Sequence, residues 1–189
     1  MTLHSWEFDP KRIAFQSARY KFVAKMFAGM NDVLEVGCGD GWGSRIVRQH
    51  VNSMSAVDAD GKSIEQALLH ASDRWRIHFQ RHDILDGPIP GFDGVFCLDV
   101  FEHIEEEALL LKNLRATARV CIIGIPSLES QAYASPGSLE RHVNCKTGED
   151  LRAVCKEHWE HVFMFGMNDE TLHTGFLPMS HYLLALCVR

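Results

Sequence analysis

Several features that mark other classes of protein are missing from this sequence of 189 residues. Its six cysteines form no Cys-x-x-Cys pair, which argues against a zinc knuckle or a redox dithiol. No apolar run approaches the ~20 residues that cross a bilayer, so we expect no membrane insertion. The 19 Lys and Arg are scattered among 25 Asp and Glu, so the basic stripe of nucleic-acid binders is also lacking. These absences favour one globular domain in the reducing cytoplasm.

Short apolar runs alternate with amphipathic stretches along most of the chain. We expect strands at 33–36, 54–58, 76–80, 94–98, 119–125, 162–167 and 182–188, and helices at 10–29, 42–50, 62–71, 105–116 and 148–156. Strands that alternate with helices predict a parallel sheet, and the last two strands, with no helix between them, should pair antiparallel. The predicted class is therefore α/β, a Rossmann-like doubly wound sheet of seven strands with an antiparallel last strand and helices on both faces.

The domain is expected to span residues 1–189, with a helical segment at 1–30 before the first strand. Residues 126–146 are rich in Ser, Gly and Pro and are predicted to form one long loop. Together with 168–180, this loop should lie on the substrate side, because ligands of open α/β sheets bind beyond the carboxyl ends of the strands.

The most specific motif is a strand that runs into a glycine-rich turn, Glu35-Val36-Gly37-Cys38-Gly39-Asp40-Gly41-Trp42-Gly43. Glycine lets a backbone turn tightly and approach a ligand. The dinucleotide fingerprint would need glycine at the position of Trp42, which disfavours an NAD-dependent oxidoreductase. Asp58 ends the second strand about twenty residues downstream, where a carboxylate can accept from ribose hydroxyls. Asp83 follows the third strand, where it can accept from an exocyclic amine while Ile84 packs on a ring.

These residues resemble the class I S-adenosylmethionine-dependent methyltransferases, in particular the small ubiquinone-biosynthesis-type and polysaccharide-cluster enzymes. The turn matches the family's first motif, Asp58 its ribose acid, His82–Ile84 its adenine segment, and Phe92–Ile104, with its Glu-His pair, its fourth-strand motif. The resemblance implies S-adenosyl-L-methionine as cofactor and S-adenosyl-L-homocysteine as product. The cofactor site that it implies consists of Arg19, Glu35, Gly37, Cys38, Gly39, Asp58, Ala59, Asp83, Ile84 and Leu98.

Three of the eleven histidines fall in segments expected at the carboxyl edge of the sheet, namely His103, His142 and His173. An oxygen nucleophile needs a base to remove its proton, and imidazole suits that task near neutral pH. His142 is the first candidate for this base, and ordering of its own loop is the alternative role. We expect His103 to tether the loop after the fourth strand through Glu102. His173 is a further candidate for substrate contact, unless its segment is only a turn.

The string Asp99-x-x-Glu102-His103, with the distant His142, is similar to the carboxylate and histidine arrangement of the metal-dependent small-RNA end methyltransferases. Such a mixed set of oxygen and nitrogen ligands would suit Mg, Mn or Zn. We nevertheless expect no metal, because the string also occurs in relatives without an obvious need for one.

The expected function is methyl transfer to a small hydroxylated acceptor, such as a sugar or polysaccharide precursor. O-methylation is favoured because the Asn-Pro-Pro-Tyr motif of amide and adenine methylation is absent. The alternatives are a metal-dependent methyltransferase of the RNA 3'-end type and a non-catalytic cofactor-binding relative. We expect a small-molecule partner and no nucleic acid, and we allow for a homodimer.

Overall fold

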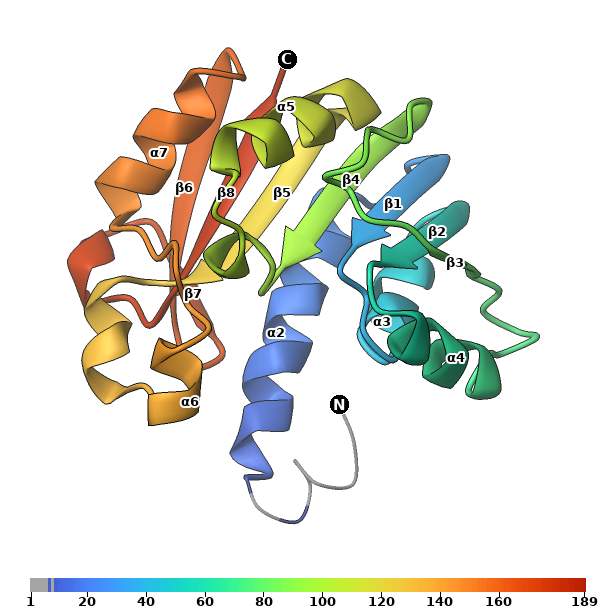
Figure 1. The fold of residues 1–189 in the computed structure, drawn as a ribbon, viewed down its shortest axis with the longest axis horizontal. Helices are drawn as coiled ribbons and strands as arrows, with labels where there is room; N and C mark the ends of the chain where they lie inside the picture. Colours follow the sequence, from blue (N-terminus) through green and yellow to red (C-terminus); the bar gives the residue numbers. More distant parts are fainter. Residues whose placement is uncertain (1–6, 8) are drawn as a thin grey trace.

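The computed structural model describes residues 7 and 9–189, which contain one eight-stranded sheet with the order β3-β2-β1-β4-β5-β8-β6-β7 (Figure 1). Its strands are β1 (Asp32–Val36), β2 (Ser53–Asp58), β3 (His78–Arg81), β4 (Phe92–Leu98), β5 (Ala118–Pro126), β6 (His161–Asn168), β7 (Thr171–His173) and β8 (Tyr182–Val188). The first five pair in parallel, whereas β8 is antiparallel to both β5 and β6. All seven predicted strands are confirmed, and β7 is an eighth strand, too short for its periodicity to reveal it.

The helices are α2 (Lys11–Met26), α3 (Ser44–Arg48), α4 (Gly61–Leu69), α5 (Glu107–Thr117), α6 (Pro136–Leu139) and α7 (Gly148–Lys156), with the 3₁₀ helices η1 (Phe101–His103), η2 (Glu129–Tyr133) and η3 (Leu177–Met179). Residues 1–6 and 8 of the predicted N-terminal segment lie outside the described residues. Within the described part of the chain, no helix has the length and apolar character that crossing a membrane requires.

Two hydrophobic cores lie on opposite faces of the sheet, because successive side chains of a strand point to opposite sides. Val95 of β4 packs in the core that includes Leu110 of α5. Its neighbour Phe96 packs in the core that includes Val23 of α2. Figure 1 shows α5 and α7 in front of the sheet. Burial on both faces confirms the doubly wound architecture.

The prediction of one long loop at 126–146 is wrong in one respect, because this segment contains η2 and α6. Ser135 caps α6 by accepting a hydrogen bond from the N–H of Ser138. Both helices are shorter than the window over which apolar periodicity can be detected. Thr147 caps α7 in the same way through the N–H of Asp150, and α7 has the predicted bounds. The segment that follows β5 is therefore ordered by local caps as it passes the carboxyl edge of the sheet.

Candidate active site

The glycine-rich turn between β1 and α3 lies at the carboxyl edge of the sheet. Gly37, Gly39 and Gly41 have φ angles of 78°, 54° and 71°, a region that side-chain-bearing residues rarely adopt. A Cβ added at Gly37 would also collide with the side chain of Val100, whereas one at Gly39 would meet no atom within 4 Å. The turn requires glycine at Gly37 for space as well as for conformation.

Asp58 fastens this turn to the end of β2. Its Oδ2 accepts a hydrogen bond from the N–H of Gly39 at 2.8 Å, and its Oδ1 accepts one from the N–H of Asp60 at 2.9 Å. The N–H groups of Gly37 and Cys38 donate to the carbonyl of Val57. A carboxylate offers about four acceptor positions, so Asp58 retains capacity for a ligand hydroxyl.

A polar cavity of about 200 Å³ opens beside the turn. Its lining residues are Gln16, Tyr20, Gly37, Cys38, Gly39, Asp40, Trp42, Gly43, Leu98 and Asp99. Four of them were predicted as cofactor residues, and Tyr20 of α2 belongs to the Arg19-Tyr20 pair that the resemblance placed near the cofactor. Gln16 of α2 and Asp99 after β4 were not predicted to bind it. The sequence gives no spacing signal for the α2 residues, because they reach the cavity only when the helix packs on the sheet. A larger groove of about 770 Å³ runs between α7, β6 and residues 174–178, and none of the predicted site residues lines it.

Glu35 lies behind the turn and does not line the cavity. Its side chain is buried, and the hydroxyl of Tyr20 donates to its Oε1 at 3.0 Å. Burial raises the pKa of Glu35 to about 7. The ring of Tyr20 also occupies the space that a Cβ would need at Gly43. Glu35 therefore connects α2 to the sheet through Tyr20 and supports the turn from behind.

Arg19 and Asp99 form an ion pair near the cavity. Nη1 of Arg19 donates to both carboxylate oxygens of Asp99, at 3.1 and 3.0 Å, and the guanidinium lies over the ring of Tyr182 at 3.7 Å from its centroid. Asp99 has a φ of 57°, which is strained for a residue other than glycine. Arg19 was predicted to contact the cofactor. In the structure its Nη1 holds Asp99 at the cavity wall.

The remaining predicted cofactor residues follow β2 and β3 at the same edge and do not line the cavity. The carbonyl of Ala59 accepts from Nε of Arg81 at 3.1 Å. Oδ1 of Asp83 accepts from the N–H of Leu85 at 2.9 Å, which shapes a local turn. The side chain of Ile84 is 4% exposed and packs in the core beneath α5.

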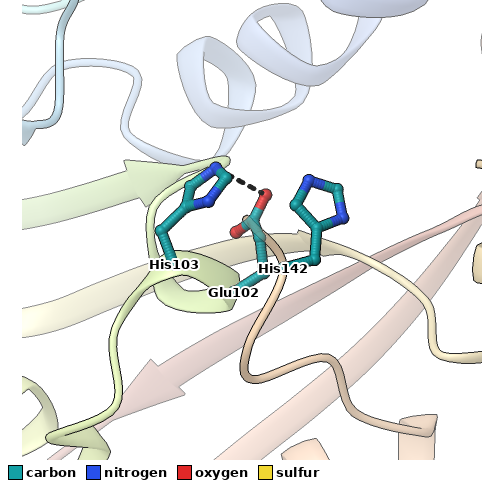
Figure 2. A group of neighbouring side chains, drawn as sticks. All are labelled: Glu102, His103 and His142. Carbon is teal, nitrogen blue, oxygen red and sulfur yellow. Dashed lines mark ion pairs between the residues drawn. The ribbon is translucent and has the colours of Figure 1, made fainter. Parts of the chain in front are cut away.

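Glu102, His103 and His142 meet beside this cofactor region, and each offers one atom within 4.8 Å of the others. Figure 2 shows the Glu102 carboxylate between the two imidazole rings. Its side chain is 1% exposed, and Oε1 lies 3.9 Å from Nε2 of His103. Its Oε2 is buried without a hydrogen-bond partner among the described residues. A buried carboxylate thus faces two imidazoles with no direct hydrogen bond between them.

Backbone contacts hold the two segments of this cluster together. The N–H of Asn144 donates to the carbonyl of Glu102 at 3.0 Å. Nδ1 of His103 lies 2.9 Å from the carbonyl oxygen of Arg141. A carbonyl only accepts, so Nδ1 of His103 carries the hydrogen and Nε2 presents its lone pair. His103 therefore tethers its loop through Arg141 as well as facing Glu102.

The protonation of the cluster reflects its burial. Burial and the Asp99 carboxylate raise the pKa of Glu102 to about 8, against the opposing charge of Arg19. Burial and the neighbouring His103 lower the pKa of His142. Asp99 also raises the pKa of His142, so its charge reaches both Glu102 and His142. Asp99 thus connects the cofactor cavity electrostatically to the cluster.

The structure separates the three predicted histidines. His103 and His142 have ring centroids 5.1 Å apart. His173 belongs to β7, where its Nε2 lies 3.1 Å from Oδ1 of Asn168 and 3.3 Å from Oγ of Ser180. It is outside the cluster. Glu102 was expected from the sequence both as a tether for His103 and, with Asp99, His103 and His142, as one of a set of possible metal ligands. Three of these four residues meet in the cluster.

The matched family and the curated relatives agree with this geometry. Residues 33–121 match the family described as "Methyltransferase domain". A probable S-adenosylmethionine-dependent methyltransferase of Mycobacterium tuberculosis is 28% identical over 56% of this chain and 38% of its own length. The mitochondrial ubiquinone biosynthesis O-methyltransferase of Schizosaccharomyces pombe is 32% identical over 52% of this chain and 39% of its own. The ubiquinone biosynthesis O-methyltransferase of Psychrobacter arcticus is 25% identical over 68% of this chain and 54% of its own length. The chain therefore spans about half or less of the length of these relatives.

Solved structures confirm the fold. The methyltransferase domain of bacterial CtHen1 aligns with a TM-score of 0.75 and 15% identity, covering 92% of this chain and 98% of that one. Magnesium protoporphyrin IX methyltransferase from Synechocystis was solved with bound S-adenosylhomocysteine. It aligns with a TM-score of 0.67 and 18% identity, covering 93% of this chain and 84% of that one. The glycine turn, the ligand capacity of Asp58 and the cavity beside the turn fit the cofactor of these relatives, S-adenosylmethionine. The matched segment and the curated relatives support the class I S-adenosylmethionine-dependent methyltransferases as the family that this chain resembles.

Proposed function

We propose that this protein transfers the methyl group of S-adenosylmethionine to a hydroxyl oxygen of a small acceptor, such as a sugar or polysaccharide precursor. The observation that carries this proposal is that the glycine-rich turn, with the cavity beside it, and the histidine cluster lie at the same carboxyl edge of the sheet. Asp99 lines the cavity beside the turn and acts electrostatically on His142. The ubiquinone biosynthesis O-methyltransferases among the relatives support oxygen as the methylated atom.

The chain's own residues would bind and orient the two reactants. Gly37 and Gly39 would approach the methionine part of the cofactor, and Asp58 would accept from the ribose hydroxyls. When bound, the cofactor supplies a methyl group on a positively charged sulfur. Alignment of that methyl with the acceptor oxygen provides much of the acceleration in such a displacement.

His142 is the proposed base. Nε2 of His142 would take the hydroxyl proton of the acceptor in a displacement that would break the C–S bond of the cofactor and form the C–O bond of the product. This nitrogen has no hydrogen-bond partner among the described residues, whereas Nδ1 lies 2.9 Å from Oε1 of Gln131. The lowered pKa of His142 keeps the imidazole neutral at neutral pH, the form that a base requires. Glu102 lies beside the ring, where a positive charge forming on His142 would favour ionisation of this carboxyl group, and the carboxylate would then stabilise the imidazolium.

A second candidate function is favoured by the same cluster. Glu102, His103 and His142 could hold a divalent cation such as Mn²⁺ or Zn²⁺, because one carboxylate and two imidazoles are a common ligand set. Nδ1–H of His103 donates to a backbone carbonyl, the outer contact typical of a metal-bound histidine. A bound cation would polarise the acceptor oxygen. This candidate is the alternative to the metal-free site expected from the sequence, and it does not imply an RNA acceptor.

The proposed compartment is the cytoplasm. Its support is that all six cysteines are free thiols, five of them buried in the fold as small apolar side chains.

Calorimetry with S-adenosylhomocysteine and transfer of a labelled methyl group to a panel of sugars and phenols test the proposal. We expect binding, transfer to at least one hydroxylated acceptor, and loss of transfer in His142→Asn with binding retained. Absence of cofactor binding would contradict the whole proposal, and transfer only to nitrogen acceptors would contradict O-methylation.

Titration of metal-free protein with Mn²⁺ and Zn²⁺ separates the two candidates. Under the cation candidate, one ion should bind to the wild type but not to Glu102→Gln, and a chelator should abolish methyl transfer until the ion is restored. Full activity in excess chelator would leave His142 as a base without a metal.

A further inference from the structure

The orientation of Gln131 determines which nitrogen of His142 is available. Gln131 lies in η2, and its Nε2 lies 3.2 Å from the carbonyl oxygen of Ser127 and 3.4 Å from Oγ of Ser130. A carbonyl oxygen accepts and cannot donate, so the amide nitrogen must occupy this side. The amide oxygen of Gln131 must therefore face His142.

The same reasoning then fixes the hydrogen of His142. Oε1 of Gln131 lies 2.9 Å from Nδ1 of His142 and can only accept. Nδ1 must therefore carry the hydrogen, and Nε2 is left with its lone pair. His142 and His103 consequently adopt the same tautomer, one through a side-chain oxygen and the other through a backbone oxygen.

The segment that carries Gln131 is itself anchored. Oγ of Ser127 is buried and donates to the carbonyl of Ser180 at 2.6 Å. The N–H of Leu128 donates to the carbonyl of Lys146 at 2.9 Å. The Ser127 carbonyl that orients Gln131 is thus held by both the segment before β8 and the segment before α7. These anchors give the amide one defined orientation.

We infer that Gln131 is a positioning residue that selects the Nδ1–H tautomer of His142 and makes Nε2 its working atom. The inference deepens the proposed function and rests on it in one respect, namely that Nε2 is the atom used as base or as metal ligand. Gln131 itself does not touch the reacting atoms. It acts through His142 from a different segment of the chain.

Nitrogen-15 NMR of histidine-labelled protein tests this directly, without cofactor, metal or acceptor. Spectra are recorded at least about two pH units above the ordinary imidazole pKa of 6.5, so that the rings are neutral. His142→Asn identifies the His142 signals. We expect the wild type to carry the hydrogen on Nδ1. In Gln131→Met, which keeps the length but removes the acceptor, the ratio of Nδ1–H to Nε2–H should fall about 5- to 10-fold, the effect of one hydrogen bond.

Two further variants sharpen the result. Gln131→Glu keeps an acceptor oxygen and should restore the Nδ1–H form. Gln80→Met, the same substitution on the exposed strand β3, should leave the His142 signals unchanged. A hydrogen on Nε2 in the wild type, or an unchanged ratio in folded Gln131→Met, would overturn the inference. If Gln131→Met does not fold, the wild-type and Gln131→Glu spectra still decide, because an Nε2–H form in either contradicts it.

Calorimetry on the same samples keeps the two proposals distinguishable. Loss of S-adenosylhomocysteine binding in the wild type would contradict the proposed function while leaving the tautomer assignment intact. Normal binding with His142 in the Nε2–H form would contradict only the role of Gln131.

Discussion

The two halves of the site are built by different means. The cofactor half is a backbone structure, in which glycines with positive φ angles are fastened by the single carboxylate of Asp58. The proposed catalytic half is a group of side chains from η1 and from the segment after α6, oriented by hydrogen bonds to Arg141 and Gln131. A backbone-built site requires particular residue types at fixed positions, whereas a cluster of side chains can be assembled from common residues far apart in sequence.

The first test substitutes the glycines. Gly37→Ala should lower the free energy of unfolding by about 2–5 kcal/mol, because strain at positive φ and collision with Val100 add together. Gly39→Ala, which adds strain without a collision, should cost about 1–2 kcal/mol. Urea unfolding measures both, and equal losses would mean that space around Gly37 is not what the turn requires.

The second test removes the charge behind the turn. The pKa of Glu35 rises from 4.5 to about 7 in the folded state, so folding is favoured by its protonation. Its contribution is therefore complete below pH 4.5 and declines as the pH rises through 7. Between pH 5 and pH 8, the free energy of unfolding of the wild type should fall by about 2 kcal/mol more than that of Glu35→Gln. Urea unfolding at both pH values measures this, and parallel losses would contradict the buried position of the carboxyl.

The third test concerns the ligand capacity of Asp58. Asp58→Asn should weaken S-adenosylhomocysteine binding about 10- to 100-fold, because hydrogen bonds to a charged acceptor are worth about 1.5–3 kcal/mol. Asp93→Asn is the matched control, since Asp93 also accepts from backbone N–H groups, those of Asn31 and Asp32, but lies at the start of β4, at the opposite edge of the sheet. Calorimetry should find the affinity of Asp93→Asn for S-adenosylhomocysteine unchanged. Similar losses of affinity in both variants would remove Asp58 from the cofactor site.

The smallest effect on cofactor binding is expected from substitutions in the histidine cluster. His142→Asn and Glu102→Gln should change the affinity for S-adenosylhomocysteine by no more than about 2-fold, because the cluster does not line the cofactor cavity. The same calorimetric titration measures it. A loss comparable to that of Asp58→Asn would show that the two halves form one binding surface.

The sequence predicted the backbone-built half more completely than the other. Its glycine turn and Asp58 lie within a short stretch of chain, and their order along it is diagnostic. The choice of His142 rested on where its segment should lie, and the structure places it beside His103. Gln131 could not be predicted, because its contact with His142 depends on η2, which is too short to leave a periodic signal. Gln16 was not predicted for a similar reason, since its role depends on how α2 packs against the sheet.

That packing has a consequence for how the protein relates to its family. The segment that matches the methyltransferase family begins at residue 33, after α2 has ended. Yet α2 supplies Gln16 and Tyr20 to the cavity wall and Arg19 to the ion pair with Asp99. The matched segment thus provides the floor of the proposed cofactor cavity, and the preceding helix provides one wall. A chain that began at residue 33 would lack α2 and would leave the cavity open to solvent on that side.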